Sequence, residues 1–571
     1  MAARSESLRL PAGSRVMETG GFKGRSRNVN RRELHQLMEE RLGVSSDAVF
    51  NEYGMTELSS QLYARGGGES LRWEVPPWVR ARALDPVTRE DMPAGEVGVL
   101  AFIDLANRSS ALAVLTSDLG RVEGDGRVEI LGRAGGTTPR GCSLSLDMLL
   151  GESRRPPPVM ASPERTREVV QRVDSLKVAR RAHLSGKSLQ SIAEALGEVS
   201  RRWCTVDDPF RVEALSLLPE ELGISRPVLE VGLMRSFSQW STSALKALHA
   251  TEIPKGASAL KEGPEVTWVV AAGNLPTPLA WDVMCALLVR SAVLVKPSTR
   301  CPSFAGMFKR SLAAVSPELA SCVEIALWPG GSAVLENVAM DAVDTVLVNG
   351  SDSTVRALQS RVPPTTRFVG RGTRLSLGYV GRERMTRESL VKWLPRALED
   401  VALWDQRGCL SPVAWVVETG GSLSPEEFAE AYSEGMAALG EEWPRGRMDM
   451  ESEVALMACW DDYRVRAALS EDVLCWPHAV LERTEFSPQG LVGRHVRVLP
   501  VSPDVGGANV LQEWRGLLST VVVVGDGATH ERVKQWSSRL GASRICAPGD
   551  AQSPSASWRH DGRDVLRSLF T

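Results

Sequence analysis

The chain has no excess of charge of either sign, no long apolar run and no paired-cysteine motif, and each absence removes a class of protein. Its 67 Lys and Arg residues against 70 Asp and Glu give a formal net charge of −3, so the basic surface typical of nucleic-acid binding is missing. No apolar run is long enough to span a bilayer, and the first residues lack the apolar core of a signal peptide. We therefore expect a cytoplasmic protein without a membrane span or a nucleic-acid partner.

The nine cysteines are scattered, with no C-x-x-C pair and no cysteine–histidine cluster at zinc spacing. This pattern favours reduced thiols and predicts no metal ligands. Reduced cysteines serve mostly as small core residues, which is the role we assign to Cys285, Cys301 and Cys322. A few cysteines in such proteins act as nucleophiles. For the remaining cysteines, the neighbouring residues in the sequence decide between these two roles.

One break in composition divides the chain. Residues 151–168, GESRRPPPVMASPERTRE, contain three consecutive prolines flanked by charge, which neither a helix nor a central strand accommodates. We predict a linker there, after a domain of short strands and Gly-rich turns at residues 1–150. Residues 169–571 follow, with a mostly helical lead-in and cofactor-binding region at 169–390 and a catalytic region at 391–571.

From Val266 onward, apolar strand candidates alternate with segments of helical spacing. The strand candidates are VTWVVAAG, AVLVKPS, VEIALWPGG and DTVLVNGS. Regular alternation of apolar strands and helices predicts an α/β fold with a parallel sheet covered on both faces. Ligands of such sheets bind beyond the carboxyl ends of the strands, where AAGNLP, KPS, WPGG and NGS fall. No G-x-G-x-x-G follows these strands, so an ordinary Rossmann phosphate site is not supported.

An isolated cysteine, Cys409, stands in WDQRGCLSP on a predicted helix-to-strand turn. Together with AAGNLPTP, VLVKPS and VLVNGSDSTV, this turn resembles the aldehyde dehydrogenase superfamily. The closer similarity is to the acyl-CoA reductase of the bacterial luciferase fatty-acid reductase complex, which the terminal segment GASRICAPGDAQSPSASWRHDGRDVL also resembles. The resemblance covers roughly residues 160–571 and implies a parallel-sheet dinucleotide domain plus a catalytic domain.

A thioester reductase needs a thiolate, an oxyanion site and a nicotinamide beside the acyl carbon. Cys409 suits the first role, because a thiolate readily forms a covalent intermediate, and we expect its sulfur to be ionised and reachable from the dinucleotide cleft. Backbone N–H groups of the turn would stabilise the developing negative charge, and the resemblance adds the amide of Asn274 as a second donor. It also implies NADPH, with NADH as the alternative, and a set of cofactor-binding residues: Lys296, Ser298, Gly330, Gly350 and Ser351.

The implied reaction transfers a long-chain acyl group from acyl-CoA or an acyl-protein to Cys409 and reduces it to the fatty aldehyde. Hydrolytic aldehyde dehydrogenases use the glutamate of a Glu-Leu-Gly-Gly motif to activate water, and TRLSLGYVG here has no such glutamate. Its absence fits the exclusion of water and leaves the general base for Cys409 unassigned. No sequence pattern pairs His478, His530 or His560 with that cysteine. We interpret VVVVGDGATH as a core strand running into a turn rather than a phosphate loop.

The N-terminal part resembles a different superfamily. VFNEYGMTELSSQLY, TSDLGRV and ILGRAGG resemble motifs of adenylate-forming enzymes, and with METGGFKGRSR they resemble the acyl-protein synthetase partner of the same complex. By this resemblance Thr56 and Glu57 face the nucleotide phosphates and Mg²⁺, Asp118 binds the ribose hydroxyls, and Arg133 is the ribose-side arginine of the hinge. Cys142 corresponds to the acyl-accepting cysteine; an exposed loop cysteine without a function is the alternative.

The synthetase resemblance is incomplete. No Gly- and Ser/Thr-rich phosphate loop precedes these motifs and no catalytic lysine segment follows them. We therefore expect only a C-terminal fragment of the synthetase, a partial adenylate-forming domain that does not use ATP and Mg²⁺ by itself; a docking module without activity is the alternative. The expected partners are a fatty acyl-CoA or acyl-protein, a separate acyl-activating subunit or acyltransferase, and further copies of the chain in a homo-oligomer.

Two rival functions follow from other features. The chain as a whole could act as an acyl-protein synthetase or ligase whose reductase half only receives acyl groups. LSGKSLQSIAEALGEVSRRW, at residues 184–203, resembles a helix-turn-helix DNA reader. Because no basic surface accompanies it, we interpret this segment as the helical lead-in of the reductase.

Overall fold

The computed structural model describes residues 9–19, 31–66, 71–133, 162–253, 263–488, 491–503 and 510–570. The chain divides into two compact units. The first comprises Met1–Thr137 with Asp449–Ala458, and the second comprises Thr138–Met448 with Cys459–Thr571. Among the described residues, no helix is both long enough and apolar enough to cross a membrane.

The first unit contains two small sheets of short strands, as its Gly-rich turns predict. In one sheet β1 runs parallel to β2, and β2 pairs antiparallel with β3; the other is an antiparallel meander in the order β4-β5-β6-β7. Alternate residues of β3 are buried, the pattern of a sheet with one covered face. The elements are β1 (Val16–Thr19), α1 (Arg31–Leu42), β2 (Val49–Tyr53), β3 (Leu62–Arg65), β4 (Val79–Leu84), β5 (Val97–Asp104), β6 (Ala113–Val122) and β7 (Val128–Arg133).

Five helices come first in the described part of the second unit. Ser162, Ser188, Asp208 and Ser241 each cap a helix by accepting a backbone N–H in its first turn. The helices are α3 (Pro163–His183), α4 (Leu189–Cys204), α5 (Pro209–Leu222), α6 (Arg226–Phe237) and α7 (Thr242–Glu252).

Helices α3 and α4 bear on two expectations from the sequence, the extent of the linker and the resemblance to a DNA reader. Helix α3 begins at Pro163, so the prediction of a linker as far as residue 168 is wrong for its last six residues, because proline is tolerated in the first turn of a helix. Residues 151–161 lie outside the described part. The segment that resembles a DNA reader forms α4, whose apolar side, including Leu196 and Trp203, is buried in the core of this unit.

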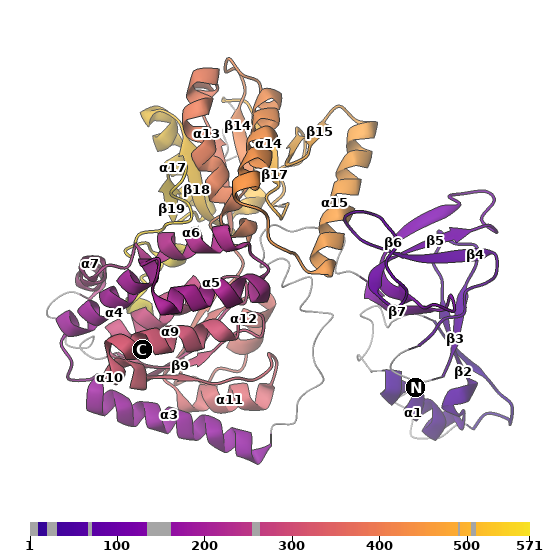
Figure 1. Ribbon diagram of the computed structural model, residues 1–571, viewed down its shortest axis with the longest axis horizontal. Helices are drawn as coiled ribbons and strands as arrows, with labels where there is room; N and C mark the ends of the chain where they lie inside the picture. The colour runs from indigo at the N-terminus through magenta and orange to yellow at the C-terminus, as the bar shows by residue number, and fades with distance from the viewer. Residues whose placement is uncertain are drawn as a thin grey trace. The chain divides into compact units, whose positions relative to one another are not determined.

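The predicted β-α-β region forms a five-stranded sheet, in the order β10-β9-β8-β11-β12. Every neighbouring pair of strands is parallel, which confirms the prediction. All residues of β8 and β9 are buried, and helices such as α3, α8 and α9 pack on the strands (Figure 1). The elements are β8 (Val266–Val270), α8 (Thr277–Leu288), β9 (Ala292–Lys296), α9 (Ser303–Val315), α10 (Pro317–Ser321), β10 (Val323–Ile325), α11 (Ala333–Ala342), β11 (Thr345–Asn349), α12 (Asp352–Gln359) and β12 (Arg367–Arg371).

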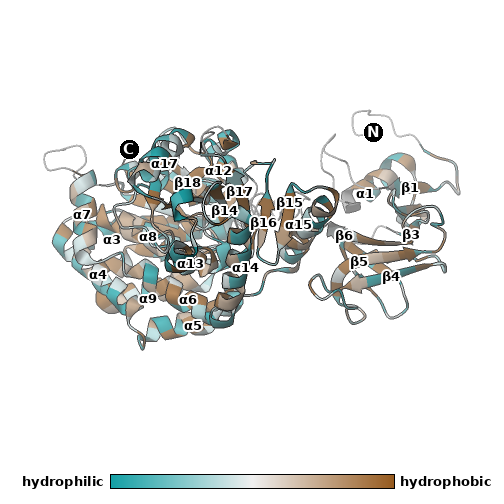
Figure 2. Ribbon diagram, turned by 90° about the horizontal axis from the view of Figure 1, so that it is seen from above, coloured by the Kyte–Doolittle hydropathy of each residue, from teal (hydrophilic) through white to brown (hydrophobic). Residues whose placement is uncertain are grey.

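A second sheet of seven strands follows, in the order β15-β16-β17-β14-β13-β18-β19. It is parallel except for the β15–β16 pair, and its central strands are strongly apolar (Figure 2). VVVVGDGATH forms the end of β18, a short turn and the start of α17; the strand and the turn were predicted, and the helix was not. The elements are β13 (Leu375–Val380), α13 (Arg387–Ala402), β14 (Pro412–Glu418), α14 (Pro425–Glu442), α15 (Met450–Leu469), β15 (Val473–Trp476), β16 (Ala479–Glu482), β17 (Val496–Val501), β18 (Leu518–Val524), α17 (Gly527–Leu540) and β19 (Arg544–Cys546).

Strands β13 and β14 separate two cores. Leu377 and Tyr379 pack into one core, whereas Trp415 and Val417 pack into the other, because successive strand residues point to opposite faces. Gly378 permits this close pairing: a Cβ there would lie 2.0 Å from the ring of Trp415. Strand β14, which follows the turn of Cys409, and its neighbour β13 are therefore fixed by packing on both faces.

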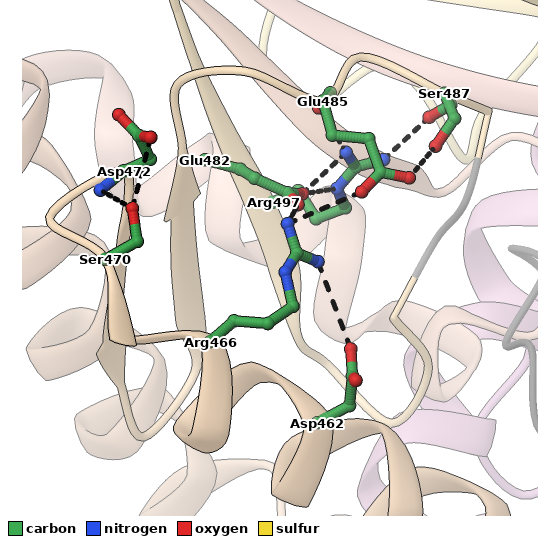
Figure 3. A network of polar contacts seen from close by, with 8 residues as sticks. All are labelled: Asp462, Arg466, Ser470, Asp472, Glu482, Glu485, Ser487 and Arg497. Carbon is green, nitrogen blue, oxygen red and sulfur yellow. Dashed lines mark hydrogen bonds and ion pairs between the residues drawn. The ribbon is translucent and has the colours of Figure 1, made fainter. Parts of the chain in front are cut away.

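A buried cluster of charges joins β16 and β17 to the last turns of α15 (Figure 3). Glu482 and Arg497 are almost completely buried and lie 2.6 Å apart. Arg466 of α15 also contacts Glu482, and Arg497 donates a hydrogen bond to the carbonyl of Ser487 at 2.6 Å. Because each buried charge has a partner, we interpret this cluster as structural.

Candidate active site

Cys409 lies in a short turn between the helical segment η4 (Leu403–Gln406) and strand β14, as predicted. The residue as a whole is partly exposed. Three consecutive residues before it, Trp404, Asp405 and Gln406, have φ angles of +62°, +51° and +62°. Left-handed backbone costs a non-glycine residue about 1–2 kcal/mol, and such strain persists where the surroundings enforce it.

A buried ion pair provides part of that enforcement. Arg494 Nη2 lies 2.6 Å from Asp405 Oδ1, and Arg494 Nε lies 2.8 Å from the same oxygen. The backbone N–H of Gly446 donates to Asp405 Oδ2 at 3.0 Å, and Arg494 also donates to the carbonyl of Trp443. Both members of the pair are less than 5% exposed, so the carboxylate and the guanidinium depend on each other.

The amide of Gln406 fixes the next residue of the turn. Its Oε1 accepts hydrogen bonds from the backbone N–H groups of Arg494 and His495, at 2.9 and 3.1 Å. Its Nε2 donates to the carbonyls of Pro412 and His495, at 3.1 and 2.8 Å. These four bonds use the two acceptor and two donor positions of the amide, so the turn is rigidly connected to the segment before β17.

Two side chains bond to the cysteine turn, and one of them, Asn274, was predicted. The side-chain Nδ2 of Asn274 donates to the carbonyl of Arg407 at 2.8 Å, so the AAGNLP loop after β8 and the cysteine turn are in contact. The hydroxyl of Ser376, on β13, donates to the carbonyl of Cys409 itself at 2.7 Å. Ser376 precedes Leu377-Gly378 in TRLSLGYVG, the segment in which the sequence shows no glutamate.

The electrostatic surroundings correct one expectation. Burial and, to a smaller extent, the carboxylate of Asp561 raise the pKa of the Cys409 thiol to about 12, while Arg374 and Arg371 act in the opposite direction. The expectation of an ionised sulfur is therefore wrong for this state of the molecule, in which Cys409 is a thiol at neutral pH. The sequence predicts a nucleophile at this position, but it does not show the cost of desolvating a charge there.

The arginines near Cys409 belong to a wider polar network. Arg371, at the end of β12, lies 2.5 Å from the buried carboxylate of Asp282, which also accepts a 2.6 Å hydrogen bond from Asn349. Arg374, which precedes β13, lies 3.3 Å from Asp561 in the terminal segment. Charged residues from the five-stranded sheet, from the start of the seven-stranded sheet and from the terminal segment therefore surround the cysteine.

The terminal segment is also bonded to the cysteine turn. Asp400 of α13 accepts the backbone N–H groups of Gly549 and Ala551 at 2.6 and 3.0 Å, and burial raises its pKa to about 7. Gln552 donates to the hydroxyl of Ser411 at 2.5 Å and to the carbonyl of Asp400 at 2.9 Å. Ser411 lies two residues after Cys409, so the terminal segment forms one wall of the turn.

The residues predicted to bind the dinucleotide lie at the carboxyl ends of the strands of the five-stranded sheet. Lys296 ends β9 and is 6% exposed, and burial lowers its pKa. Ser298 approaches the loop after β8, because a Cβ on Gly273 would lie 2.3 Å from its hydroxyl. Gly330 is in the turn before α11, and Gly350 precedes Ser351, which caps α12 by accepting the N–H of Thr354 at 3.2 Å. Their roles as ligands remain predictions.

In the first unit the motif residues are also brought together. The hydroxyl of Tyr53, in EYGMTE, donates to Asp118 Oδ2 at 2.6 Å, and Asp118 stands opposite Arg133 in the β6–β7 register. Thr56 and Glu57 follow in an exposed turn, where the threonine hydroxyl donates to the glutamate at 3.0 Å. Cys142 lies outside the described residues, and so does the stretch from residue 134 to residue 161.

Several residues of the site were not assigned from the sequence: Ser376, Arg371, Arg374, Asp400, Arg494, Gln552 and Asp561. The segments TRLSLGYVG and SWRHDGRDVL drew attention to some of them without giving a role. Neither His478 nor His530 joins the site: His478 stacks on His495 with 5.2 Å between ring centres, and His530 contacts the carbonyl of Asp526. Within the described residues no group of three acidic, cysteine or histidine side chains could hold a metal ion.

The fold of the second unit is that of the aldehyde dehydrogenases. Aldehyde dehydrogenase 21 from Physcomitrella patens superposes with a TM-score of 0.51 at 14% identity, covering 70% of this chain and 86% of the other. An aldehyde dehydrogenase from Burkholderia cenocepacia gives 0.51 at 13% identity, covering 67% and 83%. At this identity the similarity establishes the fold alone, which confirms the predicted α/β architecture for the second unit.

The family follows from the sequence comparison. The profile of LuxC, described as acyl-CoA reductase, matches residues 184–571, and the chain belongs to this family. The match includes the α4 segment, which supports its interpretation as a reductase lead-in. The profile of LuxE, described as acyl-protein synthetase, matches residues 1–150, so a LuxE-like region precedes the reductase.

Individual relatives agree with both assignments. A long-chain-fatty-acid–luciferin-component ligase of Aliivibrio fischeri is 28% identical over 155 residues, covering 25% of this chain and 40% of the relative. A long-chain acyl-protein thioester reductase of Photorhabdus laumondii is 21% identical over 272 residues, covering 47% and 51%. The chain thus spans about half or less of the length of these curated relatives.

Proposed function

We propose that this protein reduces a long-chain acyl thioester, on CoA or on a protein, to the fatty aldehyde through an acyl-Cys409 intermediate. The observation that carries the proposal is the rigidly held turn of Cys409, in direct contact with the Asn274 loop at the carboxyl side of the parallel sheet. Family membership and the names of the relatives support the substrate class. Arg407 contributes to the rigidity, because its guanidinium donates to the carbonyl of Gly223 at 2.8 Å.

In the proposed reaction, the sulfur of Cys409 attacks the acyl carbon and the donor thiol leaves. The side-chain amide of Asn274 and the backbone N–H of Cys409 would stabilise the oxyanion. Loss of one such donor typically lowers kcat by about 10²–10³. The hydroxyl of Ser376, in the segment TRLSLGYVG that contains no glutamate, donates to the carbonyl of Cys409. The absence of a glutamate from this segment supports transfer to a thiol rather than to water.

The residues around the sheet edge fit a nicotinamide dinucleotide. The buried ammonium of Lys296 makes no hydrogen bond or ion pair with the described residues, and a Cβ on Gly330 would meet no atom within 4 Å. An ammonium without a protein partner beside open space suits a ribose or a 2′-phosphate, so we propose NADPH, with NADH as the alternative. When bound, the cofactor supplies the hydride. Lys296, Ser298, Gly330, Gly350 and Ser351 would hold it.

For residues 1–150 we propose a C-terminal fragment of an adenylate-forming acyl-protein synthetase. The Tyr53–Asp118 hydrogen bond supports the assignment, because it joins two motifs of that superfamily. Cys142 would carry an acyl group delivered by a separate acyl-activating subunit or acyltransferase. Tethering it to the reductase would give an effective concentration of roughly millimolar with a short flexible linker. A ligase that uses the reductase half only as an acceptor is the alternative function.

Two measurements test these proposals. Incubation with tetradecanoyl-CoA and NADPH should yield tetradecanal from the wild type and none from Cys409→Ala. Aldehyde formation that survives in the Cys409→Ala protein would disprove the proposed reductase mechanism. In a Cys409→Ala background, mass spectrometry after acyl transfer from an acyl-activating subunit should find the acyl group on Cys142; a Cys142 peptide without label removes the carrier role and leaves the reductase proposal intact.

A further inference from the structure

One side chain joins the two ends of the segment that carries Cys409. This segment begins at Asp400, in the last turn of α13, where helix carbonyls lack partners within the helix, and it ends at Ser411, directly before β14. The amide nitrogen of Gln552, in the terminal segment, donates to the carbonyl of Asp400 at 2.9 Å and to the hydroxyl of Ser411 at 2.5 Å. An amide nitrogen carries two hydrogens, so this one group closes the base of the segment.

The oxygen of the same amide lies beside the residue that precedes the nucleophile. A Cβ on Gly408 would lie 3.4 Å from Gln552 Oε1 and 3.3 Å from a methyl carbon of Leu275, which follows Asn274 in the chain. The glutamine therefore approaches the segment both before and after Cys409. It does so from a part of the chain more than a hundred positions away.

Gln552 is itself held in place. The carboxylate of Asp400 accepts the backbone N–H groups of Gly549 and Ala551, at 2.6 and 3.0 Å, and Ala551 directly precedes the glutamine. Gln552, Asp400 and Ser411 are all buried. Away from water, an amide whose N–H groups are both paired makes its surroundings more rigid.

We propose that Gln552 is a positioning residue for the acylation of Cys409. The proposal rests on the reductase function proposed above and deepens it, because it names a residue of the terminal segment on which the placement of the nucleophile depends. By closing the base of the segment, the amide holds Cys409 in a fixed place relative to the Asn274 loop, which bonds the same turn. A misplacement of about 1 Å can cost about 10²-fold in rate.

The effect should fall on the rate and not on binding. Gln552 is 5% exposed, so a bound acyl-CoA has little of its surface to contact, and the half-saturating concentration should not depend on it. A role in stability alone would make other buried hydrogen bonds of this unit equally important for the rate. Ser311, on α9, allows that comparison, because its buried hydroxyl accepts the indole N–H of Trp203 at 3.0 Å.

Gln552→Met and Ser411→Ala test the proposal. Methionine is unbranched and flexible like glutamine but has no N–H group, and Ser411→Ala removes one acceptor of the same nitrogen. Single-turnover acylation by tetradecanoyl-CoA without NADPH is measured on the full-length protein over a range of tetradecanoyl-CoA concentrations, by mass spectrometry of the Cys409 peptide. Thermal melting is recorded for every variant. Ser311→Ala is the matched control, since it removes a buried hydroxyl by the same substitution.

Gln552→Met should lower the maximal rate of acylation by about 10–100-fold and leave the half-saturating concentration within twofold of the wild type. Adding Ser411→Ala to Gln552→Met should slow acylation by less than threefold more, because both changes break the same hydrogen bond. Ser311→Ala should lower the melting temperature but keep the rate within threefold of the wild type.

Three results would overturn the positioning role: acylation of Gln552→Met within threefold of the wild type, a double variant whose loss is the product of the two single losses, or an equal loss of rate in Ser311→Ala. If Gln552→Met does not fold, Ser411→Ala decides by the same threefold limit. A wild type that forms no acyl-Cys409 overturns the reductase function and this proposal with it. Normal acylation of both the wild type and Gln552→Met removes only the positioning role.

Discussion

Arg494 and Asp405 form an ion pair 2.6 Å long in which both residues are almost fully buried and both have positive φ angles. Asp405 lies in the strained turn, four residues before Cys409. Arg494, whose guanidinium holds Asp405, lies 89 positions further along the chain. Precise placement of a nucleophile requires such support, because small displacements of a reacting group are costly in rate. The predictions below begin with this pair.

Asp405→Asn should destabilise the protein by about 3–5 kcal/mol, because it leaves the charge of Arg494 buried without a counter-ion. It should also slow the acylation of Cys409 more than it weakens NADPH binding. The change loosens the turn of Cys409, whereas the residues proposed to bind NADPH, at the edge of the five-stranded sheet, are left as they are. Urea unfolding and single-turnover acylation measure the two effects. Arg464→Gln is the control: its 3.5 Å pair with Asp461 is exposed and should contribute less than about 1 kcal/mol. Equal losses in both variants would contradict the prediction.

Asp400 should make stability fall as the pH rises. Its pKa in the folded protein is about 7, raised by burial from an ordinary value near 3.8, so between these values the folded state binds the extra proton. The contribution is complete below pH 4 and is lost at about 1.4 kcal/mol per pH unit up to pH 7. Urea unfolding from pH 5 to 8 should show wild-type stability falling relative to Asp400→Asn by that slope.

A control with the opposite shift accompanies Asp400. The backbone N–H groups of Thr529 and Ala528 lower the pKa of Asp526, the cap of α17, so its contribution is lost only as the pH falls below its ordinary range. Asp526→Asn should therefore differ from the wild type by a constant amount between pH 5 and 8. Parallel curves for the Asp400→Asn variant as well would show that Asp400 does not titrate in this window.

The cluster of Glu482 and Arg497 should behave as a coupled unit. Arg497→Met alone should cost about 3–5 kcal/mol, because Glu482 stays buried without its 2.6 Å partner. The double variant Arg497→Met, Glu482→Gln should cost less than the sum of the two single changes, since neither charge is then left alone. A double-mutant cycle by urea unfolding tests this, and strict additivity would refute the coupling.

Tyr53→Phe should loosen the first unit locally. The phenol donates a 2.6 Å hydrogen bond to the buried carboxylate of Asp118, and its removal should cost about 1–3 kcal/mol because the acceptor is charged. Hydrogen exchange of the β6 peptides should speed up accordingly. Tyr63→Phe, an exposed tyrosine of the same small sheet, should leave that exchange unchanged; an equal effect of both changes would count against a specific bond.

Much of the second unit could be predicted from the sequence. Apolar runs such as VTWVV and AVLVK leave no polar face, so they had to become buried parallel strands, and the turns after them had to meet at one edge. That argument located Asn274 at this edge, and the family resemblance placed it beside Cys409. The structure joins the Asn274 loop to the cysteine turn by one hydrogen bond. The start of α3 escaped prediction because proline ends helices in general but is accepted in a first turn.

The state and the supports of the nucleophile required the tertiary structure. Whether a thiol is charged depends on how much water and which charges surround it, and for Cys409 these come from β12, β13 and the chain end. Arg494 holds the turn from the segment before β17, and Asp561 approaches from the terminal segment. Asp405 and Arg494 are 89 positions apart, and Arg374 and Asp561 are further apart still. Contacts over such separations produce no local sequence pattern from which they could be predicted. The sequence by itself singled out Cys409 as the candidate nucleophile. Long-range packing decided which groups surround its sulfur and favours the thiol form, because burial raises its pKa.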